Sequence, residues 1–265
     1  MFRRLLIPLH LFAISLFLVG CERAPEPEAV AEEATVDVVA ELNALYHEFD
    51  EEMLTLNPVL ATFRGDHRFN DQWGPHDFLS DEYAEAMYDV HKRYLASLVE
   101  FDPEVLEGQD RLNYDIFKYD RENAIEREDQ GYNDYEALTP VSQFFSVPNF
   151  LVMLGSGATA QPFETPQQYD DWIKRSSGFA NHVDLSISKM REGVELGVVQ
   201  PRVLMEKTLP QLEAQVVESP EQSAFYGPVM RMPESFSEEE RERITAAYED
   251  HIMNVLSPAY AKLHD

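Results

Sequence analysis

The chain has 265 residues, with 21 Lys and Arg against 49 Asp and Glu, which gives a formal net charge of −28 at pH 7. Such an acidic surface repels phosphate backbones, so nucleic acid is excluded as an expected partner. The single cysteine excludes a disulfide scaffold, and 44% hydrophobic with 11% aromatic residues is more than a disordered acidic protein carries. Most of the chain should therefore fold around a sizeable core.

Residues 1–20 have the pattern of a lipoprotein signal peptide. Two arginines at positions 3 and 4 precede an apolar stretch over residues 5–19, and Gly20 stands directly before Cys21. A basic end, an apolar segment and a small residue at the cleavage point are what export and processing require. We expect cleavage between Gly20 and Cys21 and a lipid on Cys21. A retained transmembrane helix is the weaker interpretation, because the apolar stretch is shorter than the about 20 residues that span a bilayer.

Residues 21–36 join the lipidated cysteine to the rest of the chain. They are rich in Pro, Glu and Ala and lack apolar periodicity, which predicts a disordered tether. Membrane association is expected through the lipid, since the acidic chain itself is repelled by anionic headgroups. Glu22 stands where aspartate is the familiar inner-membrane retention signal of enteric bacteria. We therefore expect a location in the cell envelope, facing the periplasm, with the outer membrane favoured.

Residues 37–265 predict one all-α domain, a multi-helix array. Apolar residues recur every three or four positions, and no segment alternates as a strand would. A further helix is expected over residues 109–128. The apolar stripes are Val38, Leu42, Leu45, Phe49, Met53 and Leu56; Tyr83, Met87, Val90, Tyr94 and Leu98; Tyr169, Trp172, Ser176, Phe179, Val183, Ile187, Met190 and Val194; and Ile244, Tyr248, Ile252 and Val255.

Local signals place several helix ends. Pro58 and Gly65 bound a short helix, and Pro201 opens another. Thr165 and Ser237, each followed three residues later by Gln or Glu, form capping boxes that start two longer helices. The first of these should run unbroken to about residue 194.

The last helix expected from the sequence starts at Pro258, and Asp265 falls within it. A helix of two turns has little apolar face to bury. Either this helix packs unusually well, or the domain is truncated at its C-terminus, which is the interpretation we adopt.

Catalytic and metal-binding patterns are weak. His47 and Glu51 lie one helical turn apart, as in a metal-ligand pair, but the second histidine of a zinc-peptidase helix is replaced by glutamate. We interpret this pair as a polar helix face. Residues 155–160 fit G-x-G-x-x-A, yet the prolines at 162 and 166 exclude the strand–loop–helix context of a dinucleotide site, so a flexible loop is expected. No catalytic residue and no metal site are predicted in this chain.

One polar cluster is a candidate cleft element. Arg64, Asp66, His67 and Arg68 bring an acid, a base and two guanidinium groups together just after a short helix. Binding residues concentrate on such loops. The alternative, solvated neighbours of a helix-capping Gly65, is favoured by ordinary turn chemistry.

A group of aromatic residues is either pocket lining for an extended substrate or core. They are Tyr114, Tyr119, Tyr132, Tyr135, Phe144, Phe145 and Phe150.

Several runs resemble the bacterial family known as domain of unknown function 885, many of whose members look like lipoproteins. The runs are residues 57–69, 110–114, 163–169, 190–193 with 200–202, and 258–260. The resemblance covers nearly all of the chain after the tether. None of these runs is a catalytic signature, so the resemblance speaks for the fold more than for a mechanism.

The family is similar to helical zinc peptidases of the carboxypeptidase Taq and neurolysin kind. The resemblance implies a channel between two helical halves, a peptide substrate, and a zinc motif His-Glu-Gly-x-Pro-Gly-His in the second half. Members are about twice as long as this chain, beyond the usual size of a single domain. The zinc motif does not occur in these 265 residues, so zinc is expected only if a C-terminal half is present.

The leading hypothesis is an envelope lipoprotein that supplies the N-terminal scaffold and substrate-channel half of a zinc metallopeptidase and is not catalytic by itself. The alternative is a free-standing binding or assembly lipoprotein that closes an apolar face against a partner. A third hypothesis, an acidic cation-binding protein, rests on charge alone.

Overall fold

The computed structural model of the chain describes residues 28–265, and the side chains of residues 38–265. Within this range the protein is all-helical and contains no strand, which confirms the predicted fold class. The α-helices are α1 (Glu28–Leu56), α2 (Pro58–Phe63), α3 (Asp81–Leu98), α4 (Gly108–Asp129), α5 (Tyr132–Ala137), α6 (Val147–Gly155), α7 (Pro166–Ser176), α8 (Phe179–Leu196), α9 (Arg202–Glu213), α10 (Gly227–Met230), α11 (Glu238–His251) and α12 (Ser257–His264).

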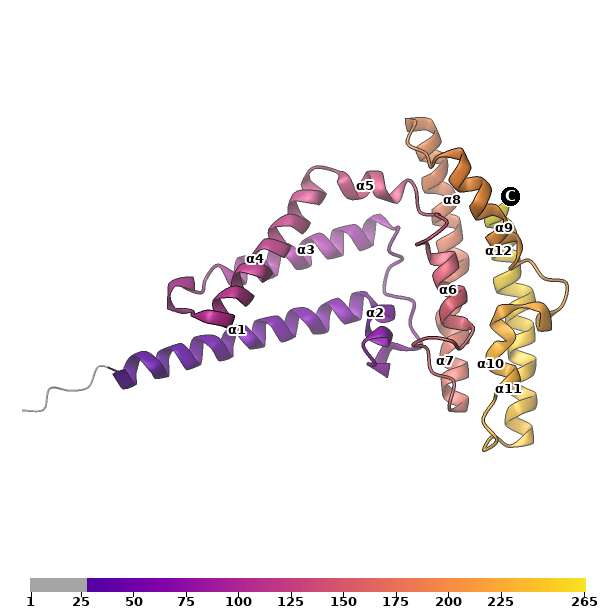
Figure 1. Ribbon diagram of the computed structural model, residues 1–265, viewed down its shortest axis with the longest axis horizontal. Coiled ribbons are helices and arrows are strands. Elements are labelled where there is room, and N and C mark those ends of the chain that lie inside the picture. Colours follow the sequence, from indigo (N-terminus) through magenta and orange to yellow (C-terminus); the bar gives the residue numbers. More distant parts are fainter. Residues whose placement is uncertain (1–27) are drawn as a thin grey trace, which may run out of the picture.

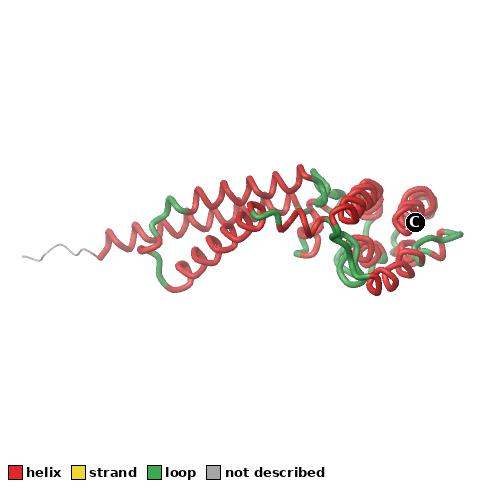
Figure 2. Tube along the Cα trace, turned by 90° about the horizontal axis from the view of Figure 1, so that it is seen from above, coloured by secondary structure: helices red, strands yellow, loops and turns green. Residues whose placement is uncertain are grey.

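The helices form two parts (Figure 1). Helices α1, α3, α4 and α5 make an elongated arm, and α6 to α12 make the body, with α2 where the two parts meet. Seen from above, several body helices are viewed nearly end-on while the arm helices lie across the view (Figure 2). The long axes of the two parts therefore cross at a steep angle.

The start of α1 differs from the sequence expectation. The helix begins at Glu28, so residues 28–36 are helical and do not form the expected tether. Alanine and glutamate are strong helix formers, and this segment consists largely of them, so the helix extends beyond its apolar stripe. The signal peptide, Gly20, Cys21 and the remainder of the tether lie outside the described residues.

The arm has a thin core. Its three longer helices are those that the sequence predicts between residues 37 and 128, and α3 and α4 pack along each other. Arg121 of α4 is buried over the rings of Phe49 and Phe117, with its guanidinium carbon 4.1 and 4.5 Å from their centroids. One buried apolar cluster of the arm consists of Leu42, Leu98, Leu106 and Tyr114, and Leu54, Val90 and Tyr94 are also buried in its helices.

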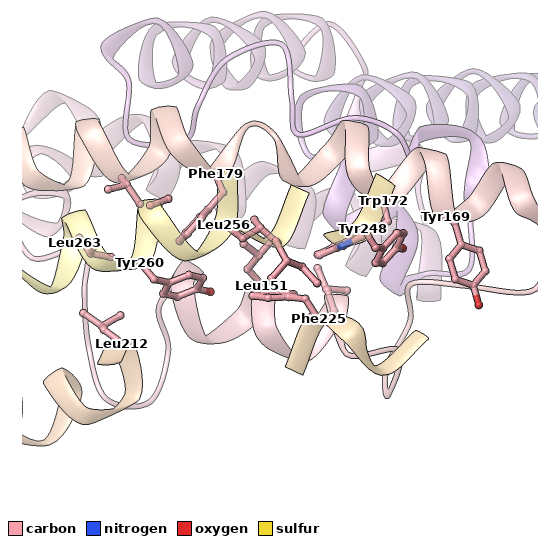
Figure 3. Close-up of a cluster of buried hydrophobic side chains, with 14 of the residues drawn as sticks. Leu151, Tyr169, Trp172, Phe179, Leu212, Phe225, Tyr248, Leu256, Tyr260 and Leu263 are labelled. Carbon is pink, nitrogen blue, oxygen red and sulfur yellow. The ribbon is translucent and has the colours of Figure 1, made fainter. Parts of the chain in front are cut away.

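The body has the larger core (Figure 3). Both predicted capping boxes are present, at Thr165 for α7 and at Ser237 for α11. Large aromatic side chains from α7, α8, α11 and α12 meet in its centre. The labelled core residues are Leu151, Tyr169, Trp172, Phe179, Leu212, Phe225, Tyr248, Leu256, Tyr260 and Leu263.

The long helix expected from residue 166 is in fact two helices. The chain turns at Ser177 and Gly178, between α7 and α8. Trp73, from the segment between α2 and α3, packs against this turn so closely that a Cβ at position 178 would lie 2.5 Å from its Cγ. The side chain of a residue far away in sequence therefore requires a glycine at this position.

The C-terminal helix is present within one residue of its expected start. α12 follows α11 through a π-helical stretch, Ile252–Leu256, without a clear stop before Pro258. Ala259, Tyr260 and Leu263 of α12 are buried, and the helix packs on α8 and α9. Despite its two turns, this helix therefore contributes a full apolar face to the core.

Candidate functional site

The four residues of the candidate cleft element lie together on the surface beside α1. The guanidinium of Arg68 binds both carboxylate oxygens of Glu51, at 2.8 and 2.9 Å, and lies 2.6 Å from Asp66 Oδ2. Arg64 pairs with Asp50, and His67 Nδ1 lies 3.2 Å from Asn70 Nδ2.

The charges of this cluster neutralise one another. The hydrogen bond from Arg68 holds the pKa of Asp66 at about 2 and lowers that of Glu51. Glu51, which lies one helical turn from His47, thus forms an ion pair with Arg68. Because Arg64, Asp66, His67 and Arg68 line none of the cavities described below, their role in a cleft stays a prediction.

A buried guanidinium that sequence reasoning missed fastens α7 to the region of α2. Arg175 is 1% exposed, and burial lowers its pKa to about 10, so it remains charged at neutral pH. All its hydrogen bonds go to neutral oxygen acceptors. They are Thr62 Oγ1 and Gln161 Oε1 at 2.8 Å, Gln72 O at 2.9 Å, Phe69 O at 2.5 Å and Pro58 O at 3.3 Å.

A second buried network joins the segment before α3 to α8. Asp77 Oδ1 lies 3.0 Å from His182 Nδ1, and Asp77 Oδ2 accepts a 2.9 Å hydrogen bond from Trp73 Nε1. Burial alone would raise the pKa of Asp77, but the hydrogen bonds and the partner histidine hold it below its usual value. Ser186 Oγ lies 3.3 Å from His182 Nε2.

The order carboxylate, imidazole, hydroxyl is that of a nucleophilic triad. Here His182 and Ser186 are both 0% exposed, so no substrate can reach the hydroxyl in this arrangement. The network instead holds the segment around residues 73–79 against α8. The network is therefore a structural contact between the arm and the body.

A cavity of about 460 Å³ lies between α3, α4, α5 and Lys189 of α8. Its walls include Tyr83, Met87 and His91 of α3. Burial lowers the pKa of His91 to about 4, so its ring is neutral, and its buried Nδ1 has no hydrogen-bond partner among the described residues. Charged groups at the cavity are largely paired, for example Lys189 with Asp81 at 3.1 Å.

Two other hollows lie on the body. One of about 660 Å³ runs between α8, α9 and the end of α12, and includes Met190, Leu209 and Leu263. The other, of about 440 Å³, surrounds the start of α6, where Phe144 is 73% and Phe145 93% exposed. We call the apolar surface formed by Phe144, Phe145, Phe150 and Met153 the aromatic surface.

The aromatic residues singled out in the sequence divide between core and surface. Tyr114 is buried in the arm, and Phe150 packs against the body core. The exposed ones are Tyr119, Tyr132, Tyr135, Phe144 and Phe145. They do not gather around one pocket, because Tyr119, Tyr132 and Tyr135 belong to α4 and α5, and the two phenylalanines precede α6.

The described side chains do not fit a zinc ion. Among residues 38–265 there is no group of three or more His, Cys, Asp or Glu placed to hold a metal. A catalytic zinc site needs three such ligands. In the same part of the chain, no helix has the length and apolar character needed to cross a bilayer.

Comparison with known proteins identifies the family. The fold matches a solved structure, "the putative lipoprotein from Colwellia psychrerythraea", with a TM-score of 0.64 and 15% sequence identity. The match covers 86% of this chain and 40% of that one, so the chain spans less than half the length of the solved protein. No curated protein matches in sequence. The family model "Bacterial protein of unknown function (DUF885)" matches residues 58–265, and the chain therefore belongs to this family.

Proposed function

We propose that these residues are the N-terminal scaffold and substrate-channel half of a longer envelope lipoprotein with zinc peptidase activity, and that they do not catalyse hydrolysis alone. The observation that carries this proposal is the coverage of the fold match, 86% of this chain but 40% of the solved protein. The family resemblance implies a zinc motif in the second half of the longer protein. That motif would then lie outside the part that corresponds to this chain. Peptides are the expected substrates and zinc the expected cofactor of that longer protein.

Two features support the lipoprotein part of the proposal. The chain carries the Gly20-Cys21 cleavage pattern after an apolar segment, and the solved protein with the same fold is itself described as a lipoprotein. Several acyl chains on one cysteine give a stable anchor, because each buried methylene contributes about 0.8 kcal/mol.

The Cys21→Ser variant tests the anchor. In the native host it should lose labelling by palmitate and keep its signal peptide, because cleavage is expected directly before this cysteine. The control is Ser15→Ala, a conservative change within the apolar stretch that keeps the cysteine and should keep the label. Palmitate labelling of Cys21→Ser would show that another residue carries the lipid.

The intact mass of the native protein, extracted from membranes of the source cells, tests whether the functional form is longer. The proposal predicts a mass well above that of residues 21–265 plus acyl chains. A mass equal to that of residues 21–265 plus acyl chains would contradict it and favour a free-standing binding or assembly lipoprotein.

Activity provides an independent test. The purified 265-residue chain should hold no stoichiometric zinc and should not cleave peptides. The longer protein should bind zinc and cleave peptides. Hydrolysis by the 265-residue chain that a chelator abolishes would overturn the scaffold role.

The aromatic surface favours the second candidate function, a lipoprotein that pairs with a partner. Phe144 and Phe145 expose large apolar area on an otherwise acidic protein, and contiguous exposed apolar patches commonly mark interaction sites. Cooperative unfolding without binding of hydrophobic dyes would support an adapted, free-standing module, and aggregation or strong dye binding would support half of a larger fold.

A further inference from the structure

The loop between α6 and α7 encloses a small polar cavity on the body. The cavity has a volume of about 270 Å³, which is below the roughly 300–1,000 Å³ of pockets for drug-sized ligands. Gly157, which has φ +72°, and Gln161 line one side, and Arg231 lines another. The loop is the G-x-G-x-x-A segment of the sequence, for which the zinc peptidase proposal gives no role.

The local fold requires this loop shape. A Cβ at Gly155 would lie 2.3 Å from Trp172 Cζ2, and a Cβ at Gly157 would lie 3.0 Å from Arg231 Nη2. Arg231 Nη2 donates a 2.5 Å hydrogen bond to the carbonyl oxygen of Ser156. The two glycines thus let the loop backbone approach both the core and the guanidinium that lines the cavity.

The cavity holds two opposite charges that do not pair. Arg231 and Glu164 are both exposed at the rim of the cavity, and within the described residues neither forms an ion pair and the Glu164 carboxylate accepts no hydrogen bond. Most other arginines of the described chain are engaged by carboxylates, as Arg243 is by Asp170 at 2.7 Å. A guanidinium and a carboxylate that flank one cavity without meeting leave room for a ligand that carries both charges.

A third polar group lacks a partner at the same place. Gln161 is 2% exposed, and its Oε1 accepts a 2.8 Å hydrogen bond from Arg175 Nη1. Its buried Nε2 has no hydrogen-bond partner among the described residues. A buried amide donor without a partner is costly, but this atom is inaccessible to solvent, so it is not counted as a ligand contact.

These observations select the ligand class. A guanidinium binds a carboxylate through two parallel hydrogen bonds, and Glu164 would oppose a dianion such as phosphate while attracting an ammonium group. We propose that this cavity binds a zwitterionic α-amino acid, with Arg231 receiving the α-carboxylate and Glu164 the α-ammonium. The proposal does not depend on the zinc peptidase function.

Isothermal titration calorimetry of the full chain tests the proposal with L-alanine as the probe. Acetate, methylammonium and inorganic phosphate are the comparison ligands, because each carries only one kind of charge. L-alanine should bind one site per chain, and each comparison ligand should bind at least about tenfold more weakly, as expected when one charge-assisted contact is lost.

Variants identify the site. Arg231→Gln and Glu164→Gln should each weaken L-alanine binding by about tenfold or more. Arg241→Gln is the matched control, since Arg241 also donates to backbone carbonyls, those of Phe236 and Pro233, but does not line the cavity. Circular dichroism melting separates lost binding from lost folding, and Glu164→Gln remains informative if Arg231→Gln unfolds, because no hydrogen bond to the Glu164 carboxylate is lost.

Three results would overturn the proposal: no saturable binding of L-alanine to the wild-type chain, equal binding of acetate or phosphate, or wild-type affinity in folded Arg231→Gln and Glu164→Gln.

Discussion

At the residue scale, Arg175 places a positive charge among neutral acceptors inside the body. Replacing it by methionine of similar length would leave the carbonyls of Phe69 and Gln72 without their donor. Hydrogen bonds to a charged group contribute about 1.5–3 kcal/mol each, and unpaired buried acceptors add to the loss. We expect Arg175→Met to lower the free energy of unfolding by about 3 kcal/mol or more, measured by urea denaturation.

The neighbouring Lys174→Met variant is the control for this prediction. Lys174 is exposed and pairs with Asp71 at 2.6 Å on the surface, where ion pairs contribute little. The free energy of unfolding of the Lys174→Met variant should stay close to that of the wild type. An equal effect of the two substitutions would show that the buried hydrogen bonds of Arg175 do not stabilise the junction.

His251 makes stability depend on pH. Burial lowers its pKa to about 4 from the usual 6.5, so the unfolded chain binds a proton more readily than the folded one. The stability contributed by the neutral ring is present above pH 6.5 and is lost progressively as the pH falls towards 4. The loss from this group should reach about 3 kcal/mol, because one unit of pKa corresponds to about 1.4 kcal/mol.

His251→Gln tests this linkage. His251 Nε2 lies 2.7 Å from Ser176 Oγ, whose own proton goes to the carbonyl of Trp172, so the ring donates and a glutamine amide can replace it. Unfolding free energies between pH 7 and 4 should fall less steeply for His251→Gln than for the wild type. The exposed His47→Gln variant should keep the wild-type slope, and a parallel slope for His251→Gln would contradict the prediction.

Sequence patterns identified the neighbours of these buried polar residues but not the residues themselves. Trp172, Ser176, Phe179 and Val183 belong to the predicted apolar stripe, and all are buried. Arg175 lies beside this stripe, and helical periodicity does not tell whether a flanking arginine points to solvent or into a ring of carbonyls. Those carbonyls come from residues 58–72, so the signal is tertiary and cannot be read locally.

At the element scale, the turn between α7 and α8 depends on Gly178. A Cβ there would lie 2.5 Å from Trp73 Cγ and 2.7 Å from Trp73 Cβ. Gly178→Ala should displace Trp73 and destabilise the protein by about 1–3 kcal/mol, as overpacking does. Urea denaturation and tryptophan fluorescence, which reports on Trp73 and Trp172, measure the two effects.

Ser177→Ala is the matched control at the same turn. Ser177 is exposed, and its hydroxyl donates only to the carbonyl of Ile173 at 2.8 Å. In the Ser177→Ala variant, neither the free energy of unfolding nor the tryptophan fluorescence should change appreciably. If Gly178→Ala is as stable as Ser177→Ala with an unchanged spectrum, the close approach of Trp73 does not shape this turn.

Elements whose ends are set by local chemistry were predictable. The capping boxes at Thr165 and Ser237 and the short helix between Pro58 and Gly65 are present as expected. Helix α6 was not predicted, because its nine residues are nearly all apolar and show no polar face. The interruption after Ser176 was not predicted, because the close packing of Trp73 on Gly178 joins residues far apart in sequence.

At the scale of the whole molecule, the arm and the body have unequal cores. The buried apolar cluster of the arm is small, with a few further buried residues in α1 and α3, whereas that of the body spans α6 to α12. Regions with few buried apolar contacts open at lower free energy. Hydrogen exchange followed by mass spectrometry should therefore find faster exchange in α1, α3 and α4 than in α7, α8 and α11. Equal protection of both parts would mean that they unfold as one cooperative unit.

At the same scale, the aromatic surface concerns the binding of other molecules to exposed apolar area. Phe144 and Phe145 are 73% and 93% exposed, so they add little to the stability of the chain alone. The double variant Phe144→Ser/Phe145→Ser should keep the wild-type melting temperature but bind less hydrophobic dye, measured by fluorescence. Val199→Ser/Val203→Ser, at positions 58% and 57% exposed, is the control and should bind dye like the wild type. If Phe144→Ser/Phe145→Ser binds as much dye as the wild type, the dye binds at another apolar surface. If its melting temperature is lower than that of the wild type, these rings stabilise the body and are not available to a partner.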